Sequence, residues 1–368
     1  MAKKLEEVKW DKFELHRLFE SLNGDTDIQK KHINGLGYYV VTSGILNNGI
    51  LGQTDISSKI FDENTITVDM FGNAFFRNFK YKLVTHARVF SLKPLISIKP
   101  EQGIFLANSL KFLSLKYGYE NMCSWEKIKN EKIQLPVKND GSIDFEFMTS
   151  FISDLEARQI SELEAYLVTT GLSDYVLNSE EEKILEIFRK DEIEWKEFKI
   201  RDLFEVNSYK KRFDANKVNI LEKGHPYVVR TALNNGIRGY LEEDEKFLND
   251  GNTISFGQDT ATMFYQEEPY FTGDKIKIIK SKYERFNKLN ALFFVSTMIK
   301  SFSSFTWGSS SFNVDIIKKQ KINLPVKGKE VDFDFMEILI SAIQKIIIKD
   351  VVLYSNKKIE ATKKLVFK

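Results

Sequence analysis

The chain has 368 residues, of which 42% are hydrophobic and 29% charged, so it can bury sizeable cores and is not a disordered protein. Its 54 Lys and Arg residues nearly balance its 52 Asp and Glu residues, which leaves a net charge of +2. This balance excludes nucleic-acid binding through a uniformly basic chain, but not through a local basic face. The length favours two domains, with three as the alternative.

Cysteine and histidine limit the chemistry available to the chain. The single Cys123 excludes an internal disulfide framework and a multi-cysteine zinc site, and it agrees with a reducing compartment. The four histidines lie far apart, without metal-ligand spacing. We find neither a signal peptide nor a segment approaching the roughly 20 apolar residues that span a bilayer. We therefore expect a soluble cytoplasmic protein with no metal site and no cofactor of its own.

The first part of the chain predicts a mostly β domain. It opens with a block from Trp10 to Phe19, and short runs rich in Val, Ile, Phe and Tyr follow at 38–42 and 65–71. Asn48-Gly49 lies between these runs and predicts a hairpin turn, because Asn and Gly tolerate the positive φ of such turns. One helix is predicted in this domain, over 103–117.

Helical segments follow this domain. From Met148 to Leu167, apolar residues recur at three- and four-residue steps, which predicts an amphipathic helix. Gly171 is a candidate C-cap of this helix. Ser179-Glu-Glu-Glu182 offers a capping box for a second helix that runs through Lys190.

The second half of the chain repeats the first. Five blocks recur in the same order, and the offset between copies drifts only from 185 to 189 residues. The pairs are Trp10-Asp-Lys-Phe13 and Trp195-Lys-Glu-Phe198; Leu46-Asn-Asn-Gly49 and Leu233-Asn-Asn-Gly236; Asn64-Thr-Ile66 and Asn252-Thr-Ile254; Lys132-Ile-Gln-Leu-Pro-Val137 and Lys321-Ile-Asn-Leu-Pro-Val326; Asp144-Phe-Glu-Phe-Met148 and Asp332-Phe-Asp-Phe-Met336. Chance could supply one such pair but hardly five in register, so the two halves should fold alike.

The predicted fold class is therefore α+β, a tandem repeat of two mostly β heads joined by long helices. We place the first head at 1–144, a central helical spacer at 145–190, the second head at 191–332 and a C-terminal helical spacer at 333–368. The apolar stripes of the two spacers favour packing against each other as an antiparallel coiled coil. The alternative is that each helix packs only on its own head. About 25 helical residues over 145–169 span roughly 37 Å, close to one turn of B-DNA at about 34–36 Å.

The repeated blocks resemble the DNA specificity (S) subunits of type I restriction–modification systems and their type IIB-like relatives. The resemblance rests on the pattern Trp-x-x-Phe-x-(Leu/Ile)-x-x-Leu-Phe, which ends at Phe19 and again at Phe204. It rests also on Gly308-Ser-Ser-Ser-Phe-Asn-Val-Asp running into Ile322-Asn-Leu-Pro325, and on a helix through Leu155–Leu167 that is similar to the family's helical spacer. The first head departs from this pattern, because Asn121-Met-Cys-Ser-Trp125 stands where the Gly-Ser-Ser-Ser loop is expected.

The resemblance implies a function. Each head would be a target-recognition domain that reads one part of a bipartite, asymmetric double-stranded DNA sequence. The helices would set the spacer and dock partners: two methyltransferase (M) subunits of N6-adenine specificity, and a nuclease subunit or a fused nuclease–methyltransferase. S-adenosylmethionine would bind the partner methyltransferase. Candidate partner-binding residues on the helices are Leu155, Leu163, Leu339 and Ile343.

The motifs of the corresponding enzymes are missing from this sequence. The chain has six prolines but no Pro-Pro pair, so the Asn-Pro-Pro-Tyr motif of amino-methyltransferases is absent. There is no Gly-x-x-x-x-Gly-Lys-Ser/Thr phosphate loop, and Glu194-Trp-Lys196 matches only a minimal nuclease fragment. We therefore expect a noncatalytic subunit. The alternatives are a tandem-domain interaction protein that binds protein or glycan and, more weakly, a self-sufficient endonuclease with an unrecognised site.

DNA-binding candidates are basic side chains for phosphates and polar side chains for base edges, although any one of them alone is more easily read as a solvated surface charge. In the first head they are Lys30, Lys31, Arg77, Lys80 and Lys82. In the second head they are Lys210, Lys211, Arg212, Arg230, Arg238, Gln258, Ser309, Ser310 and Asn313. The framework blocks repeat while the loops between them differ, as expected if two copies of one scaffold read different half-sites.

Overall fold

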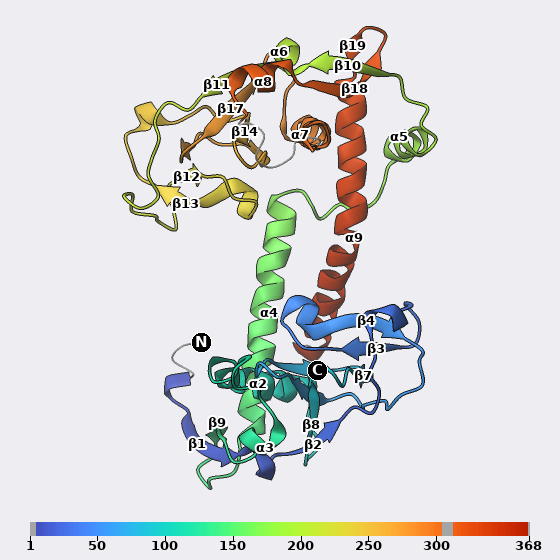
Figure 1. Ribbon diagram of the computed structural model, residues 1–368, viewed down its shortest axis with the longest axis vertical. Helices are drawn as coiled ribbons and strands as arrows, with labels where there is room; N and C mark the ends of the chain where they lie inside the picture. Colours follow the sequence, from blue (N-terminus) through green and yellow to red (C-terminus); the bar gives the residue numbers. More distant parts are fainter. Residues whose placement is uncertain (1–4, 304–311, 367–368) are drawn as a thin grey trace. The chain divides into compact units, whose positions relative to one another are not determined.

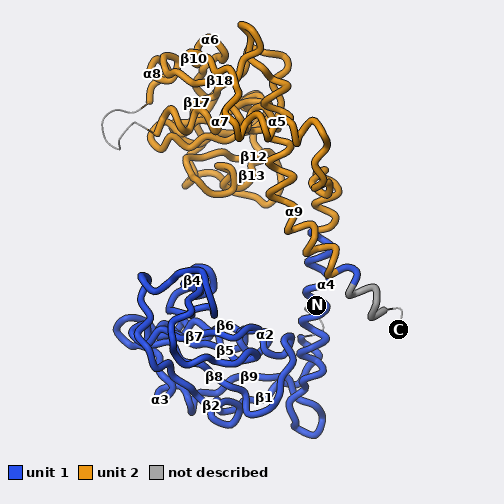
Figure 2. The backbone as a smooth tube through the Cα atoms, turned by 90° about the vertical axis from the view of Figure 1, so that its right-hand side faces the viewer, with its two compact units in different colours: residues 1–163, 359–368 blue, residues 164–358 orange. Residues whose placement is uncertain are grey.

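A computed structural model describes residues 5–303 and 312–366. Contacts divide the chain into two compact units, residues 1–163 with 359–368, and residues 164–358 (Figure 2). The segment boundaries predicted from the sequence, which treat the helices separately, stay a prediction. Within the described residues, none of the helices combines the length and the apolar composition needed to cross a bilayer.

The first head contains three small sheets (Figure 1). Strand β1 pairs antiparallel with β9, a four-stranded sheet has the order β2-β8-β5-β6, and a three-stranded sheet has the order β4-β3-β7, with β3 and β7 parallel. The strands are β1 Lys9–Glu14, β2 Phe19–Asn23, β3 Tyr38–Val41, β4 Ile50–Thr54, β5 Thr65–Val68, β6 Ala74–Arg77, β7 Tyr81–Leu83, β8 Phe90–Pro94 and β9 Lys132–Val137.

The second head repeats this topology, with one additional strand, β19, in its first sheet. Its orders are β10-β18-β19, β11-β17-β14-β15 and β13-β12-β16, again with one parallel pair, between β12 and β16. The strands are β10 Trp195–Lys199, β11 Phe204–Ser208, β12 His225–Val228, β13 Ile237–Leu241, β14 Thr253–Gly257, β15 Met263–Gln266, β16 Phe271–Thr272, β17 Ile276–Ser281, β18 Lys321–Lys327 and β19 Glu330–Val331. The shared topology confirms that the two halves fold alike, and the content is mixed helix and sheet as predicted.

Helices complete both heads and form the long segments. They are α2 Pro100–Ser109, α3 Trp125–Ile128, α4 Phe145–Thr169, α5 Ser179–Arg189, α6 Ile200–Leu203, α7 Lys288–Phe302, α8 Val314–Lys319 and α9 Phe333–Val366. The short 3-10 segments are η1 Leu15–Arg17, η2 Lys30–His32, η3 Leu46–Gly49, η4 Lys111–Leu115, η5 Asn234–Gly236 and η6 Glu245–Phe247. The helix predicted over 103–117 is thus split into α2, which starts earlier at a favourable N-terminal Pro100, and η4.

The repeated opening tryptophan anchors a helix in each head. Trp10 stacks on Phe105 of α2 with ring centroids 6.3 Å apart, and Trp195 stacks on Phe293 of α7 at the same 6.3 Å. In both heads, the tryptophan thus joins the first strand to a helix, which accounts for the recurrence of the opening block.

A β-bulge also recurs at the same place in the β4-β3-β7 sheet and the β13-β12-β16 sheet. The register shifts between Val40 and Val41 in the first head, and at the equivalent point of β12 in the second. Gly52 and Gly239 lie opposite, with φ of 150° and 159°. A Cβ on Gly52 would lie 2.5 Å from the Cγ2 methyl of Ile33, and one on Gly239 would lie 2.3 Å from that of Ile220, so glycine is required at both positions.

Each long helix packs its first turns on its own head. Phe147, Phe151 and Ile152 of α4 join the core of the first head, whose buried strands β5 and β8 supply much of the rest. Met336 and Leu339 of α9 join the core of the second head. The antiparallel coiled coil and its alternative, in which each helix packs only on its own head, both stay predictions.

Helix α5 is held against α9 within the second unit by a buried polar contact. The Glu181 carboxylate accepts hydrogen bonds from the Ser341 hydroxyl at 2.7 Å and from Lys345 Nζ at 3.1 Å. The capping box of α5 is formed by Asn178 and Glu181, one residue before the predicted Ser179 and Glu182. The predicted assignment was wrong by one position because Asn178 is also a strong N-cap residue. Gly171 adopts φ of 72° just after the end of α4, as expected of a C-cap glycine.

Candidate nucleic-acid interface

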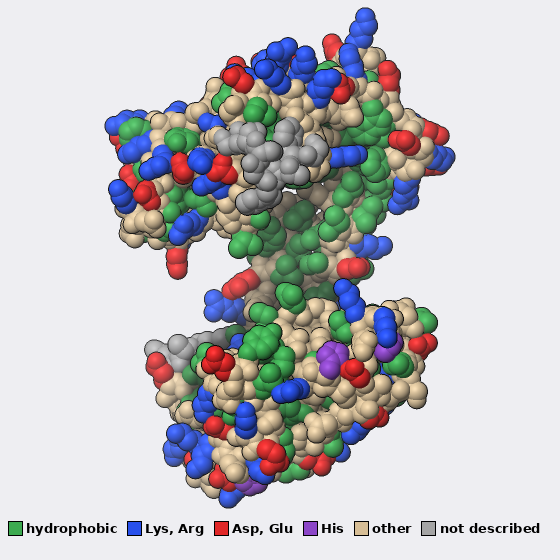
Figure 3. Space-filling model, in the orientation of Figure 1, with side chains coloured by type: hydrophobic (Ala, Val, Ile, Leu, Met, Phe, Trp, Pro, Cys, Tyr) green, Lys and Arg blue, Asp and Glu red, His purple; other side chains and the backbone are tan. Residues whose placement is uncertain are grey.

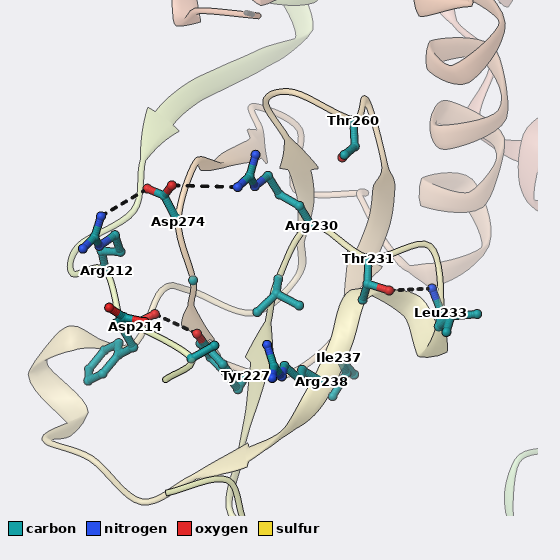
Figure 4. Close-up of a pocket in the computed structure, with 14 residues that line it drawn as sticks. Arg212, Asp214, Tyr227, Arg230, Thr231, Leu233, Ile237, Arg238, Thr260 and Asp274 are labelled. Atoms are coloured by element: carbon teal, nitrogen blue, oxygen red, sulfur yellow. Dashed lines mark hydrogen bonds and ion pairs between the residues drawn. The ribbon is translucent and has the colours of Figure 1, made fainter. Parts of the chain in front are cut away.

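Three predicted DNA-binding arginines of the second head meet at one pocket of about 770 Å³. Arg212 comes from the loop before β12, Arg230 follows β12, and Arg238 lies in β13 (Figure 4). The parallel pairing of β12 with β16 places Gly273 and Asp274 on the same rim. The topology therefore brings together three arginines that are up to 26 positions apart in the sequence. It also brings Asp274 to them from still further along the chain.

Two carboxylates orient the first two arginines. Asp274 lies 3.7 Å from Arg212 and 3.8 Å from Arg230, and Asp259 forms an ion pair with Arg230 and a 2.9 Å contact with Lys275. We did not predict these aspartates, and nothing in their local sequence distinguishes them from other surface acids.

Arg238 differs from its two neighbours. It is exposed, and no ion-pair partner is found for it among residues 5–303 and 312–366. Beside it, the Tyr227 hydroxyl donates a hydrogen bond to the Phe213 carbonyl at 2.7 Å, and burial raises the pKa of Tyr227. The pocket thus presents one unpaired guanidinium next to two that are held in place.

Lys210 and Lys211 directly precede Arg212 in the sequence, and their side chains make different contacts. Lys211 Nζ sits over the rings of Phe213 and Phe247, at 4.7 and 4.4 Å from their centroids. The Lys210 backbone donates to Asn249 Oδ1 at 3.1 Å, and its ammonium lies 3.9 Å from Asp250. Both lysines are exposed, so both can reach a phosphate.

Surface charge agrees with a local rather than a global basic face. Lys and Arg side chains on the visible face of each unit are interspersed with Asp and Glu (Figure 3). This distribution matches the net charge of +2. Any contact with DNA would therefore depend on particular clusters of basic residues, such as the arginine pocket.

Among the described residues of the first head, we find no pocket that gathers several arginines. Lys30 and Lys31 are exposed on η2 and line a shallow pocket of about 420 Å³ together with Asp27 and His86. His86 bonds to Asp27, and this hydrogen bond holds the pKa of the Asp27 carboxyl below its usual value. Lys80 is exposed in the turn between β6 and β7.

Arg77 and Lys82 require a correction, because both are buried, at 2% and 3% exposure. Arg77 Nη2 donates to the Asn48 carbonyl at 2.7 Å and its Nε to Thr67 Oγ1 at 2.9 Å. Lys82 Nζ donates to the carbonyls of Thr54 and Ile56. These side chains satisfy backbone groups inside the head, so we remove them from the proposed interface.

The second head shows what Arg77 does. Gln266 occupies the equivalent place at the end of β15 and donates to the Asn235 carbonyl at 3.0 Å and to Ser255 Oγ at 3.0 Å. Arginine and glutamine thus tie the same Leu-Asn-Asn-Gly turn to the same strand. The role is structural, although an arginine in sequence looks like a DNA ligand.

The remaining polar candidates are less informative. Asn313 is the N-cap of α8 and accepts a hydrogen bond from the Ile316 amide at 2.9 Å. Gln258 is half-buried, and its backbone bonds to Lys275 and Phe312. Ser309 and Ser310 lie outside the described residues.

The predicted partner-binding residues differ in how deeply they are buried. Leu155 is half-buried against the core of the first head, and Leu163 is half-buried further along α4. Leu339 is only 1% exposed inside the core of the second head, and Ile343 packs against that core. Leu339 is therefore unavailable to a partner, because its side chain supports its own head.

Across the part of the chain that the structure describes, no group of three or more His, Cys, Asp or Glu side chains is arranged to hold a metal ion. The buried Cys123 has no second thiol to pair with, since it is the only cysteine in the sequence.

Comparison with known proteins identifies the family. The family model described as "Type I restriction modification DNA specificity domain" matches residues 7–165 and 192–353, one match in each half. The specificity subunit S.BcgI of the type II restriction enzyme BgcI from Heyndrickxia coagulans is 36% identical over 153 residues, which is 41% of this chain and 44% of that relative. The match therefore spans less than half of the relative's length.

A solved structure has the same fold. The S subunit of a type I restriction–modification system from M. genitalium aligns over 98% of this chain and 94% of its own, with a TM-score of 0.61 at 14% identity. The resemblance inferred from the repeated blocks is thus confirmed. Because the family model covers most of both halves, the chain belongs to the family of type I restriction modification DNA specificity domains.

Proposed function

We propose that this chain is the noncatalytic specificity subunit of a restriction–modification complex and that each head reads one part of a bipartite duplex DNA sequence. The observation that carries the proposal is the convergence of Arg212, Arg230 and Arg238 on one pocket of the second head. Guanidinium groups bind phosphates in a bidentate manner and read the O6 and N7 atoms of guanine.

The three arginines have different assigned roles. Arg230 is held by Asp259 and Asp274, so it shapes the pocket. Arg238 is exposed and unpaired within the described residues, and we assign it to a base edge. Arg212, with the neighbouring exposed Lys211, is assigned to the phosphate backbone.

The bipartite character is supported by the difference between the two heads. Each sheet of one head has a counterpart in the other, but the exposed basic residues differ. The first head exposes Lys30, Lys31 and Lys80, and no arginine pocket is found among its described residues. One scaffold with two sets of surface residues suits two different half-sites. The 25 residues of α4, which span about 37 Å, suit an unread spacer of about one DNA turn.

Docking of methyltransferase subunits is assigned to the long helices. On α9, the apolar side chains Ile346, Ile347 and Tyr354 are 45%, 71% and 53% exposed, and on α4 Tyr166 is 57% exposed. These residues replace Leu339 as candidate partner contacts. S-adenosylmethionine would bind the methyltransferase, and a nuclease subunit would join the same complex.

Binding of a randomised duplex library by the full chain, co-expressed with its methyltransferase, tests the reading of DNA. Arg238→Ala should relax specificity at one base pair by about 1–3 kcal/mol, because one bidentate pair is lost. Arg212→Ala should instead weaken binding to all sequences and lower the salt slope by about one unit. Arg189→Ala, on the exposed end of α5, is the matched control and should change neither. Unaltered selection by Arg238→Ala, together with an unaltered affinity and salt slope of Arg212→Ala, would remove the pocket from the interface.

Co-purification tests the docking of the methyltransferase. Ile347→Glu should release the methyltransferase from the chain, since a charge would be buried in an apolar contact. Ile299→Glu, at a 50% exposed position of α7, should not. Equal retention of the partner by both variants would exclude this face of α9.

A further inference from the structure

The Leu-Asn-Asn-Gly turn presents an exposed leucine at the same point of both heads. Leu46 is 87% exposed and Leu233 is 76% exposed, and both turns connect the first two strands of the three-stranded sheet. We call Leu46 and Leu233 the tip leucines. A leucine so exposed gives up the roughly 1.5–3 kcal/mol that its burial would contribute, so its recurrence needs a reason outside the folded head.

The turn that carries each tip leucine has the same backbone conformation and the same side-chain hydrogen bond in both heads. Both asparagines of each turn have positive φ, between 47° and 52°. The side-chain amide of Asn47 donates to the Ile50 carbonyl at 3.2 Å, and that of Asn234 to the Ile237 carbonyl at 3.1 Å. The positive φ values and these bonds explain why the asparagines and the glycine recur. They do not involve the leucine side chain, so local structure does not explain the leucine.

The residues around the turn have diverged between the heads. Ser43-Gly44-Ile45 precedes the first turn, whereas Arg230-Thr231-Ala232 precedes the second. On the following strand, Leu51 stands where the second head has Arg238. A leucine kept among such differences should contact something that is the same for both heads, whatever sequence each head reads.

In the second head, the tip leucine lines the arginine pocket. Leu233 belongs to the same rim as Arg212, Arg230 and Arg238, and its backbone amide donates to Thr231 Oγ1 at 3.2 Å (Figure 4). Leu233 therefore lies next to any duplex that these arginines contact. Apolar side chains inserted between base steps partly unstack and kink the duplex, and this contact does not require a particular base.

We propose that the tip leucines act as wedges, each inserted at one base step of its half-site, and that the arginine pocket of the second head positions Leu233 there. The inference rests on the proposed reading of DNA by the heads. It adds that the bound duplex is deformed at two matched points, one for each head. Specificity would then depend in part on how easily those steps unstack, at positions where no side chain reads a base.

Fluorescence of 2-aminopurine, which rises on unstacking, tests the wedge. The probe is a duplex selected from a randomised library by the full chain with its methyltransferase, substituted with 2-aminopurine one position at a time. We expect a rise in fluorescence at one step in each half-site. Leu233→Ala should abolish the rise in one half-site and Leu46→Ala in the other, each with roughly 10- to 100-fold weaker binding, because the burial of one leucine is lost. Leu115→Ala, at a position 89% exposed on η4, is the matched control and should change neither signal.

The outcomes separate the wedge from its premise. If no duplex is selected, the proposed reading of DNA fails. If a duplex is selected but its fluorescence and affinity are the same with both tip variants, only the wedge is refuted. Loss of the methyltransferase on co-purification of the tip variants, with duplex binding intact, would instead assign the turn to protein docking and overturn the wedge. Thermal unfolding of both variants should match that of the wild type, since the side chains removed are exposed.

Discussion

Replacement of Arg77 tests whether a buried arginine, rather than turn chemistry alone, holds the first Leu-Asn-Asn-Gly turn. Two charge-assisted hydrogen bonds, to the Asn48 carbonyl at 2.7 Å and to Thr67 at 2.9 Å, contribute roughly 1.5–3 kcal/mol each. Against them, burial lowers the pKa of Arg77 to about 10, which corresponds to a cost of about 3 kcal/mol for the charge. The net contribution of the arginine is therefore small, between about 0 and 3 kcal/mol.

Variants at this position should differ according to their hydrogen bonding. Arg77→Met keeps much of the volume but leaves the Asn48 carbonyl unpaired, and it should destabilise the head by about 2–3 kcal/mol. Arg77→Gln reproduces the bonds that Gln266 makes in the second head, with no charge to bury, and should lie within about 1 kcal/mol of the wild type.

Hydrogen exchange resolves the effect locally, which matters in a chain with two units. The Thr42 amide, which donates to the Gly49 carbonyl at 2.8 Å, should exchange faster in Arg77→Met and at a near wild-type rate in Arg77→Gln. The corresponding amide of Val229, which donates to the Gly236 carbonyl at 2.8 Å, is an internal control and should not change. Equal protection in the Met and Gln variants would refute the assignment, since the two differ mainly in their ability to donate these bonds.

Two further predictions follow from buried ionisable groups. Burial raises the pKa of the Cys123 thiol to about 12, so in the native protein at pH 8 it should react with a thiol reagent at least about 100-fold more slowly than a free cysteine; labelling at the free rate would contradict this. Burial acts to raise the pKa of Glu181, but hydrogen bonds from Asn178, Ser341 and Lys345 outweigh it and hold that pKa below its usual value. The stabilisation by ionised Glu181 is thus present above its unfolded pKa of about 4.3 and lost as the pH falls through the lower folded value. Glu181→Gln should lower the free energy of unfolding by about 1–2 kcal/mol near pH 7, in urea titrations, and this loss should vanish as the pH falls through the lowered folded pKa of Glu181. Glu186→Gln, which removes only an exposed ion pair with Lys190, is the control, and an equal effect of both variants would rule out the buried contact.

The repeat made much of the fold predictable. Trp10 and Trp195 occur at the start of alike blocks, and the structure shows them stacked on equivalent helices at equal distance. The amphipathic periodicity from Met148 to Leu167 predicted a helix that is observed as α4. Both signals are carried by the chain itself, since a repeated pattern and an apolar period need no knowledge of long-range packing.

The candidate site was less predictable, because a charged residue in the sequence does not reveal whether its side chain points into the head or into solvent. Arg77 and Arg238 both lie in strands next to a Leu-Asn-Asn-Gly turn, yet one is buried beneath the turn and the other is exposed beside it. Only the strand pairing distinguishes them. Asp274 was missed for a related reason, since the parallel pairing of β12 and β16 brings its segment to the arginines from more than 35 residues away in sequence.

The pairing of β1 with β9 has a consequence for how such chains can change. Lys9 lies opposite Val137, so the polypeptide enters and leaves the first head through adjacent strands, and Trp195 opposite Pro325 gives the second head the same closure. A head built in this way is a cassette, whose interior can be exchanged while the neighbouring helices keep their attachment points.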